Sequence, residues 1–209
     1  MRSTAKKIAA PAFDDGRKRY YDARFQATAV RVLPGEHYVT NDPTEMIVTI
    51  LGSCVSACIR DPSIGVAGMN HFMLPASDNG EWGSKIDAAM RYGNFAMEML
   101  INDLQRRGAR RERLEIKVFG GGHIGNMQSD VGKKNARFVL EYLASEGLKP
   151  VASDLGGDHA RRIHYFPADG RVKRLNLQRV EASRLTAEET KYKQSIEVAD
   201  IGGDIELFD

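Results

Sequence analysis

The sequence predicts an α/β fold in which two main helices pack on β-sheet. The chain has 209 residues and is 42% hydrophobic, which suits one well-buried domain. Several short runs of β-branched and apolar residues are separated by Gly, Pro and Asp, as expected for strands joined by turns. Two longer segments, 86–107 and 131–146, repeat apolar residues at steps of three and four, which indicates amphipathic helices.

Composition divides the chain into three regions. Residues 1–25 carry many charges and little periodicity, so we expect a mobile N-terminal arm there. Residues 26–180 hold the apolar runs and form the expected domain. Residues 181–209 are a polar C-terminal tail, which fits either one added strand or a free end.

Charge and cysteine content exclude several classes of protein. The 30 basic and 28 acidic residues are interspersed, so no field suited to nucleic acid is expected. Apolar runs end well before the roughly 18 residues that a membrane span needs, and the N-terminus lacks the apolar core of a secretory signal. Two cysteines make no disulfide framework. We therefore expect a cytoplasmic protein with no direct membrane insertion.

Turn residues and periodicity give the order of the remaining elements. A strand at 26–33 ends at Pro34-Gly35, and 36–45 is expected to be a loop because Asn41-Asp42-Pro43 signals a turn. Segment 55–59 fits either a strand or a short helix. The other expected strands are 46–51, 65–74, 114–119, 150–154 and a hairpin of 161–167 with 171–177, and polar loops are expected at 76–85 and 124–130.

The first candidate for chemistry is Cys54, which follows a Gly-Ser turn at the end of an apolar strand. A thiol in that position has free backbone N–H groups nearby, and those groups can hold an oxyanion. The alternative is that Cys54 and Cys58 are small core residues, as free cysteines most often are. A zinc site would have only three ligands, Cys54, Cys58 and His71, so no metal is expected.

The second candidate is His71, on the apolar run that follows. Enough residues separate it from Cys54 for a strand, a turn and an antiparallel return, and alternation puts it on one face with Ala67, Met69 and Met73. An imidazole can take the proton of a thiol, and ion pairing then lowers the thiol pKa. The alternative is a hydrogen-bonded core histidine. Thr49, Asn70, Ser53 and backbone carbonyls are the candidates to orient the ring.

A run of three glycines, Gly120, Gly121 and Gly122, follows the strand at 114–119. It lacks both the Lys-Ser/Thr of a P-loop and the spacing of a dinucleotide site, and no cofactor is expected. The run fits a place where backbone comes close to a substrate or to another strand, and a simple tight turn fits equally well.

With these residues in view, the chain resembles the CheD family of chemoreceptor glutamine deamidases. The resemblance rests on TILGSCVSACIRDP from residue 49, GMNHFMLP from 68, KVFGGG from 117, VGKKN from 131 and DLGGDHARRIHYFPADGRV from 154. These pieces occur in the order found in the family. Such an ordered set is far more specific than one Cys and one His.

The resemblance implies a hydrolase that converts glutamines on methyl-accepting chemoreceptor cytoplasmic helices to glutamate and releases ammonia. It implies a catalytic set of Cys54, His71 and Thr49, and an α/β layered sandwich of two main helices on mixed or antiparallel β-sheets, similar to glutamine-deamidating toxins. A thioester on Cys54 would be the intermediate, with backbone amides from Ser53 to Val55 holding the oxyanion. Asn70 and the three glycines at 120–122 are the further substrate-shaping candidates.

Two other functions fit the same residues. A non-enzymatic chemotaxis adaptor would bind receptor helices or a CheC-like phosphatase, and Cys54 would then be an ordinary buried thiol. A cysteine protease would use the same thiol and imidazole on a backbone amide. Some members of the CheD family bind the phosphatase CheC, so a CheC-like phosphatase is a possible second partner.

Overall fold

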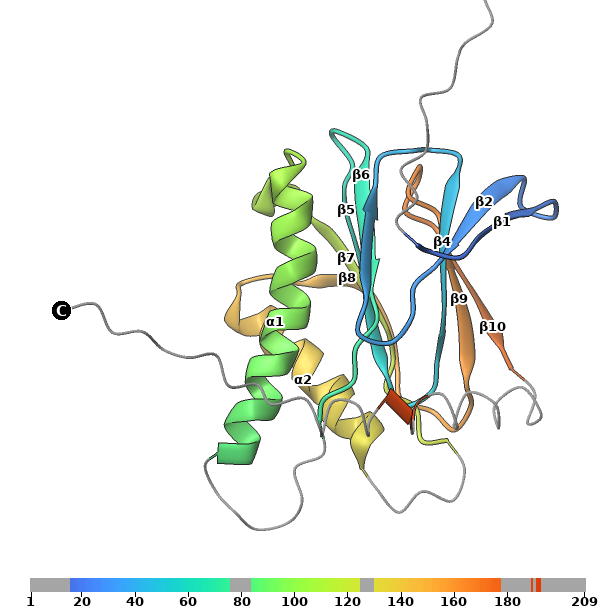
Figure 1. The fold of residues 1–209 in the computed structure, drawn as a ribbon. Coiled ribbons are helices and arrows are strands. Elements are labelled where there is room, and N and C mark those ends of the chain that lie inside the picture. The colour runs from blue at the N-terminus through green and yellow to red at the C-terminus, as the bar shows by residue number, and fades with distance from the viewer. Residues whose placement is uncertain (1–15, 76–83, 125–129, 178–188, 190, 193–209) are drawn as a thin grey trace, which may run out of the picture.

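Three layers make up the protein, as the computed structural model shows (Figure 1). Two helices cover one face of a five-stranded sheet, called sheet B, and a second five-stranded sheet, called sheet A, packs on the other face. The structure describes residues 16–75, 84–124, 130–177, 189, 191 and 192. Both sheets are mixed, with one parallel pair of strands in each. The expected α/β fold, with two main helices on mixed sheets, is confirmed.

Sheet A contains the hairpin that the sequence predicts near residue 169. Its strands, in spatial order, are β1 (Arg19–Asp22), β2 (Ala27–Arg31), β4 (Glu45–Leu51), β9 (Arg161–Tyr165) and β10 (Val172–Asn176). The parallel pair is β2 with β4, and the other pairs are antiparallel. Strand β1 falls within the segment 1–25, of which residues 1–15 lie outside the described residues.

Sheet B contains the strands that lead to the candidate site. In spatial order they are β3 (His37–Thr40), β6 (Val66–Asn70), β5 (Val55–Asp61), β7 (Glu115–Gly120) and β8 (Pro150–Leu155). The expectation of a loop at 36–45 is wrong for β3, because this short strand gains its hydrogen bonds by pairing antiparallel with β6. Segment 55–59, which fitted either a strand or a short helix, belongs to strand β5.

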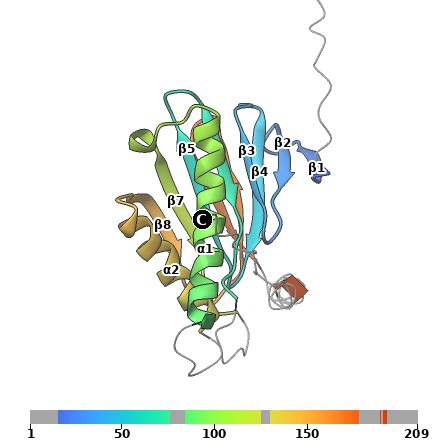
Figure 2. The ribbon, with the colours of Figure 1, turned by 60° about the vertical axis from the view of Figure 1, so that its left-hand side comes forward.

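The two helices lie where the apolar periodicity predicts them. Helix α1 spans Ser84–Arg106 and helix α2 spans Val131–Ser145, and a short 3-10 turn, η1 (Arg111–Arg113), follows α1. Gly108 and Gly147 follow the helices with φ of 94° and 67°, a backbone conformation that suits glycine at a helix end. Figure 2 shows both helices on the face of sheet B that is turned away from sheet A. Neither helix has an apolar stretch long enough to cross a membrane in the part of the chain described.

Alternation along β5 feeds two separate cores. Val55, Ala57 and Ile59 pack with side chains of α1 and α2 in one cluster. Cys54 and Cys58 point the other way and pack with residues of β4 and β9 between the sheets. Residues two apart on a strand share a face, so this split follows from the pleat. The space between the sheets is therefore where Cys54 lies.

Some expected segments lie partly outside the described residues. The polar loop at 76–85 is described only from residue 84, where α1 begins, and the loop at 124–130 is described only at its two ends. Within 181–209, the structure describes residues 189, 191 and 192.

Candidate active site

The candidate site lies where the chain crosses from sheet A to sheet B. Strand β4 ends at Leu51, and Gly52, Ser53 and Cys54 form the turn that leads into β5. Cys54 is fully buried at the end of the core between the sheets. In Figure 1 the turn is at the lower end of β4 and β5, close to the red residues of the C-terminal part of the chain.

Three consecutive backbone N–H groups of this turn point to one carboxylate, that of Glu189. The amides of Gly52 and Cys54 lie 2.9 and 3.4 Å from its Oε1. The Ser53 amide lies 3.2 Å from Oε2, and the Ser53 hydroxyl donates to the same oxygen at 2.7 Å. Successive amides that converge in this way form a concave anion site. The turn can therefore hold an oxyanion beside the thiol.

The glycine run at 120–122 supports this turn through the carbonyl groups of the turn. The amide of Gly121 donates to the Cys54 carbonyl at 2.7 Å, and that of Gly122 donates to the Gly52 carbonyl at 2.7 Å. Gly120 has φ of 109°, and a Cβ there would collide with the Cys54 carbonyl oxygen. The close approach of backbone that the glycines predict is thus an approach to the turn that carries Cys54.

Helix α2 fixes the same turn through Asn135. This side chain is fully buried; its Nδ2 donates to the Ser53 carbonyl at 2.8 Å, and its Oδ1 accepts from the Leu74 amide at 2.8 Å. The turn carbonyls are therefore bonded to the glycine run and to α2. The amides of residues 52–54 are left facing the site.

His71 stands just beyond β6, on the same face of sheet B as Cys54. β5 and β6 are antiparallel, with Cys58 opposite Met69, and Val55 pairs with Phe72 in an isolated bridge. This register makes His71 a diagonal neighbour of Cys54 rather than its direct partner. The expected face, with Ala67, Met69 and Met73 turned toward the inter-sheet core, is confirmed.

A hydrogen-bond chain across the two sheets sets the tautomer of His71. The Thr49 hydroxyl lies 2.8 Å from the Val32 carbonyl and 2.8 Å from Nδ1 of His71. A carbonyl can only accept, so the single hydroxyl proton of Thr49 goes to Val32 and Nδ1 of His71 must donate. Nε2 then carries the lone pair. Nε2 is buried and has no hydrogen-bond partner among the described residues, so its lone pair is available to accept a proton.

The resting thiol and imidazole are both neutral. Burial lowers the pKa of His71 to about 4, although the Glu189 carboxylate acts in the opposite direction. Burial raises the pKa of Cys54 well above its usual value, and the negative charge of Glu189 raises it further. The expectation of an ion pair that lowers the thiol pKa is therefore not met in this arrangement.

Two of the substrate-shaping candidates have their polar groups bonded elsewhere. The Val55 amide donates to the Phe72 carbonyl at 2.9 Å, so it is already used, and the Gly52 amide completes the concave site in its place. The Asn70 side chain accepts from the Ala57 amide at 2.8 Å and donates to the Ala96 carbonyl of α1 at 3.0 Å. It therefore lies on the helix side of sheet B.

Two residues that bear on the site are missing from the sequence expectations. Glu189 lies in a segment whose polar composition indicates a tail, and no local pattern marks one of its carboxylates as buried. The sequence pattern could have identified Asn135, because it is a polar residue on the apolar face of a predicted helix. A buried amide in that position needs hydrogen-bond partners.

This arrangement can perform acyl transfer. It combines a thiol, an imidazole with a free lone pair and a cluster of amides suited to a developing negative charge. Thr49 holds the ring in the tautomer that can accept the thiol proton.

Comparison with known proteins finds a matching family and related proteins that align over most of the chain. A family described as CheD chemotactic sensory transduction matches residues 73–175. A probable chemoreceptor glutamine deamidase CheD of Rhodopseudomonas palustris is 55% identical over 93% of this chain and 91% of its own length. The protein of the same description from Janthinobacterium sp. is 48% identical over 90% of this chain and 93% of its own.

One solved structure shares a distant likeness. The Bacillus licheniformis hypothetical protein YfiH aligns with a TM-score of 0.32 and 14% identity, over 59% of this chain and 49% of its own. A likeness at that level supports no conclusion about this chain.

Proposed function

The chain belongs to the CheD family, and from that premise we propose that it is a cytoplasmic chemoreceptor glutamine deamidase. It hydrolyses the side-chain amide of particular glutamines on chemoreceptor cytoplasmic helices, leaving glutamate and releasing ammonia. The observation that carries the proposal is the cluster of three turn amides at Gly52, Ser53 and Cys54, directly beside a buried thiol.

The first half of the reaction forms a thioester. Nε2 of His71 takes the thiol proton as the Cys54 sulfur attacks the carboxamide carbon of the substrate glutamine. The oxygen of that carboxamide gains negative charge, and the turn amides donate to it. The carbon–nitrogen bond then breaks, and the imidazolium of His71 protonates the leaving nitrogen, so ammonia departs.

The second half restores the enzyme. His71, neutral again, takes a proton from water as the water oxygen attacks the thioester carbon. The same amides hold the second oxyanion, and the carbon–sulfur bond breaks to give glutamate and the Cys54 thiol. The bond from Nδ1 to Thr49 keeps the ring in one orientation through both halves.

The arrangement of donors favours this reaction over a non-enzymatic adaptor. An adaptor has no use for three amides that converge next to a thiol, and such a polar concavity inside a core is costly unless an anion fills it. The thiol comes from the turn before β5, the imidazole from the residue after β6 and the hydroxyl of Thr49 from β4, and fixed positions of this kind favour catalysis. Binding of a CheC-like phosphatase stays a prediction from the family resemblance.

The test is to incubate a purified receptor cytoplasmic fragment with the protein, measure released ammonia and map the fragment by mass spectrometry. A deamidase converts specific glutamines to glutamate and releases one ammonia for each. A protease instead cuts the backbone, and an adaptor leaves the fragment unchanged while still binding it. Either of the last two results would overturn the proposal.

A further inference from the structure

The carboxylate that fills the turn belongs to the protein itself. Glu189 is 5% exposed, and a buried carboxylate is stable only where donors satisfy it. Its hydrogen-bond donors include the three amides of Gly52, Ser53 and Cys54, together with the Ser53 hydroxyl. An internal side chain thus occupies the position that the proposed mechanism gives to the substrate carboxamide.

The side chain of Glu189 fits the site as the product of the reaction would. Both oxygens of Glu189 face backbone N–H donors, so the NH2 of a carboxamide placed here would oppose at least one of them. Gly52 allows the close approach, since a Cβ at that position would lie 2.8 Å from Oε1 of Glu189. The site therefore holds a glutamate side chain, the product of glutamine deamidation, more tightly than a glutamine.

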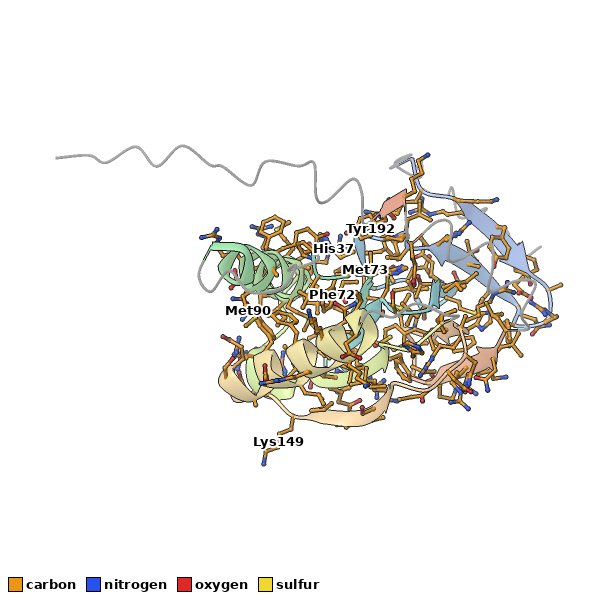
Figure 3. The ribbon with its side chains drawn as sticks, turned by 90° about the horizontal axis from the view of Figure 1, so that it is seen from below. His37, Phe72, Met73, Met90, Lys149 and Tyr192 are labelled. Atoms are coloured by element: carbon orange, nitrogen blue, oxygen red, sulfur yellow. The ribbon has the colours of Figure 1, made fainter. Side chains whose placement is uncertain are left out.

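A second contact anchors the same segment. Glu189, Lys191 and Tyr192 have helical backbone, so Glu189 and Tyr192, three residues apart, lie on one side of the segment. The Tyr192 hydroxyl is hydrogen-bonded to that of Tyr92 on α1, and its ring packs on Gly35, where a Cβ would lie 2.7 Å from the hydroxyl. Figure 3, which views the molecule from below, labels Tyr192 together with Phe72 and Met73.

We propose that the segment carrying Glu189 and Tyr192 is an internal product mimic, which occupies the carboxamide subsite and inhibits the enzyme until a receptor helix displaces it. This inference rests on the proposed deamidase function and adds a regulation of the same site. The helical backbone of the segment matches the helical form of the expected substrate. Glu189 fills the position of the target side chain, and Tyr192 fills a subsite one turn further along.

The mimic also lowers the reactivity of the thiol. Its charge lies beside the Cys54 sulfur and disfavours the thiolate, while Nε2 of His71 stays without a partner in the described part of the chain. A neutral glutamine side chain brings no such charge. Exchange of the mimic for substrate therefore removes one cause of the low reactivity of the thiol.

The sharpest test is Glu189→Gln, which turns the mimic into a substrate within the same molecule. Cys54 attacks the side-chain amide introduced at position 189, ammonia leaves with a proton from His71, and water hydrolyses the thioester, so residue 189 becomes glutamate again. Peptide mass spectrometry of the purified variant is expected to show glutamate at position 189. The double variant Cys54→Ala with Glu189→Gln is expected to keep glutamine there.

Kinetics with a receptor fragment supply the second test. If the mimic fills the site in about nine molecules of ten, Glu189→Ala raises kcat/KM for the fragment about tenfold. Lys191→Ala is the matched control, because its side chain is exposed on the same segment, and it is expected to leave kcat/KM unchanged.

The two proposals fail in different ways. If the glutamine of the Glu189→Gln variant stays unconverted in a preparation that still deamidates the receptor fragment, the mimic is overturned and the deamidase stands. An unchanged kcat/KM in Glu189→Ala would have the same meaning. Absence of ammonia release from the fragment by both the wild-type protein and Glu189→Ala would overturn the deamidase and the mimic together.

Discussion

The hydroxyl of Thr49, on sheet A, lies 2.8 Å from Nδ1 of His71, the residue that follows β6 in sheet B. This bond crosses the core between the sheets, and the Val32 carbonyl on the far side of Thr49 decides its direction. The packing of the two sheets therefore sets which nitrogen of His71 carries the lone pair. In the proposed mechanism, Thr49 therefore orients the base that accepts the thiol proton.

Replacing Thr49 by Val tests this positioning role. Valine keeps the shape and removes the hydroxyl, so the His71 ring loses its fixed tautomer, and kcat for ammonia release is expected to fall about 10- to 1,000-fold. KM for the receptor fragment is expected to stay nearly constant, because Thr49 is buried and its hydroxyl is already bonded to Val32 and His71. Thr49→Ser keeps the hydroxyl and is expected to retain most of the activity. A change confined to KM, or none at all, would contradict the role.

The buried neutral imidazole predicts a specific pH dependence of stability. The pKa of His71 is about 4 in the folded protein and near 6.5 when unfolded, so the unfolded chain binds more protons between these values. The free energy of unfolding therefore decreases as pH falls from about 6.5 to about 4, by on the order of 3 kcal/mol from this group.

Urea unfolding of the wild-type protein and His71→Gln, at about pH 7 and about pH 5, measures this contribution. Glutamine at position 71 does not titrate. As pH falls, the unfolding free energy of the wild-type protein is therefore expected to decrease relative to that of His71→Gln. Parallel pH curves for the two proteins would show that His71 is not buried in the neutral form.

Of the three glycines at 120–122, Gly120 is expected to tolerate substitution least. A Cβ at Gly120 would collide with the Cys54 carbonyl oxygen, so Gly120→Ala must displace the turn. We expect a loss of more than about 3 kcal/mol in unfolding free energy, together with loss of activity.

Gly156 provides the matched control for this change. It also has positive φ, 79°, but no atom lies within 4 Å of the position its Cβ would take. Gly156→Ala is therefore expected to cost only the backbone strain, about 1–2 kcal/mol, with activity retained. Chemical denaturation of both variants gives the comparison, and equal losses would contradict the role of Gly120 as a support of the turn.

Asn135 is expected to link stability and activity. Asn135→Ala leaves the Ser53 carbonyl and the Leu74 amide without the partner they have in the structure, which costs about 2–5 kcal/mol. Ammonia release is expected to fall as well, because the turn loses one of its supports. The neighbouring exposed Lys134 is the control, and Lys134→Ala should change neither quantity. Wild-type activity in a destabilised Asn135→Ala would show that α2 does not hold the turn in its active form.

Much of the site could be predicted from the sequence because it depends on local patterns. A Gly-Ser turn after an apolar strand marks Cys54, and alternation along the next strand puts His71 on the matching face. The glycine run at 120–122 likewise signals a close approach of backbone. Helix periodicity gives α1 and α2 nearly to their ends.

The rest depends on contacts between distant segments, which local patterns do not encode. Strand β3 has four residues and owes its form to its pairing with β6. The Val55 amide is used by Phe72, a pairing that extends beyond the regular ladder. Glu189 reaches the turn from the other end of the sequence, within a segment whose composition indicates only solvated surface.

The most direct test of the central claim compares Cys54→Ala with Cys58→Ala in ammonia release from a receptor fragment. Both thiols are buried in the same core, so the two variants remove similar packing, and only one is expected to remove the nucleophile. The account predicts that Cys54→Ala lowers kcat by more than about a thousandfold, while Cys58→Ala stays within a few-fold of wild type. Retained deamidation by Cys54→Ala would contradict it.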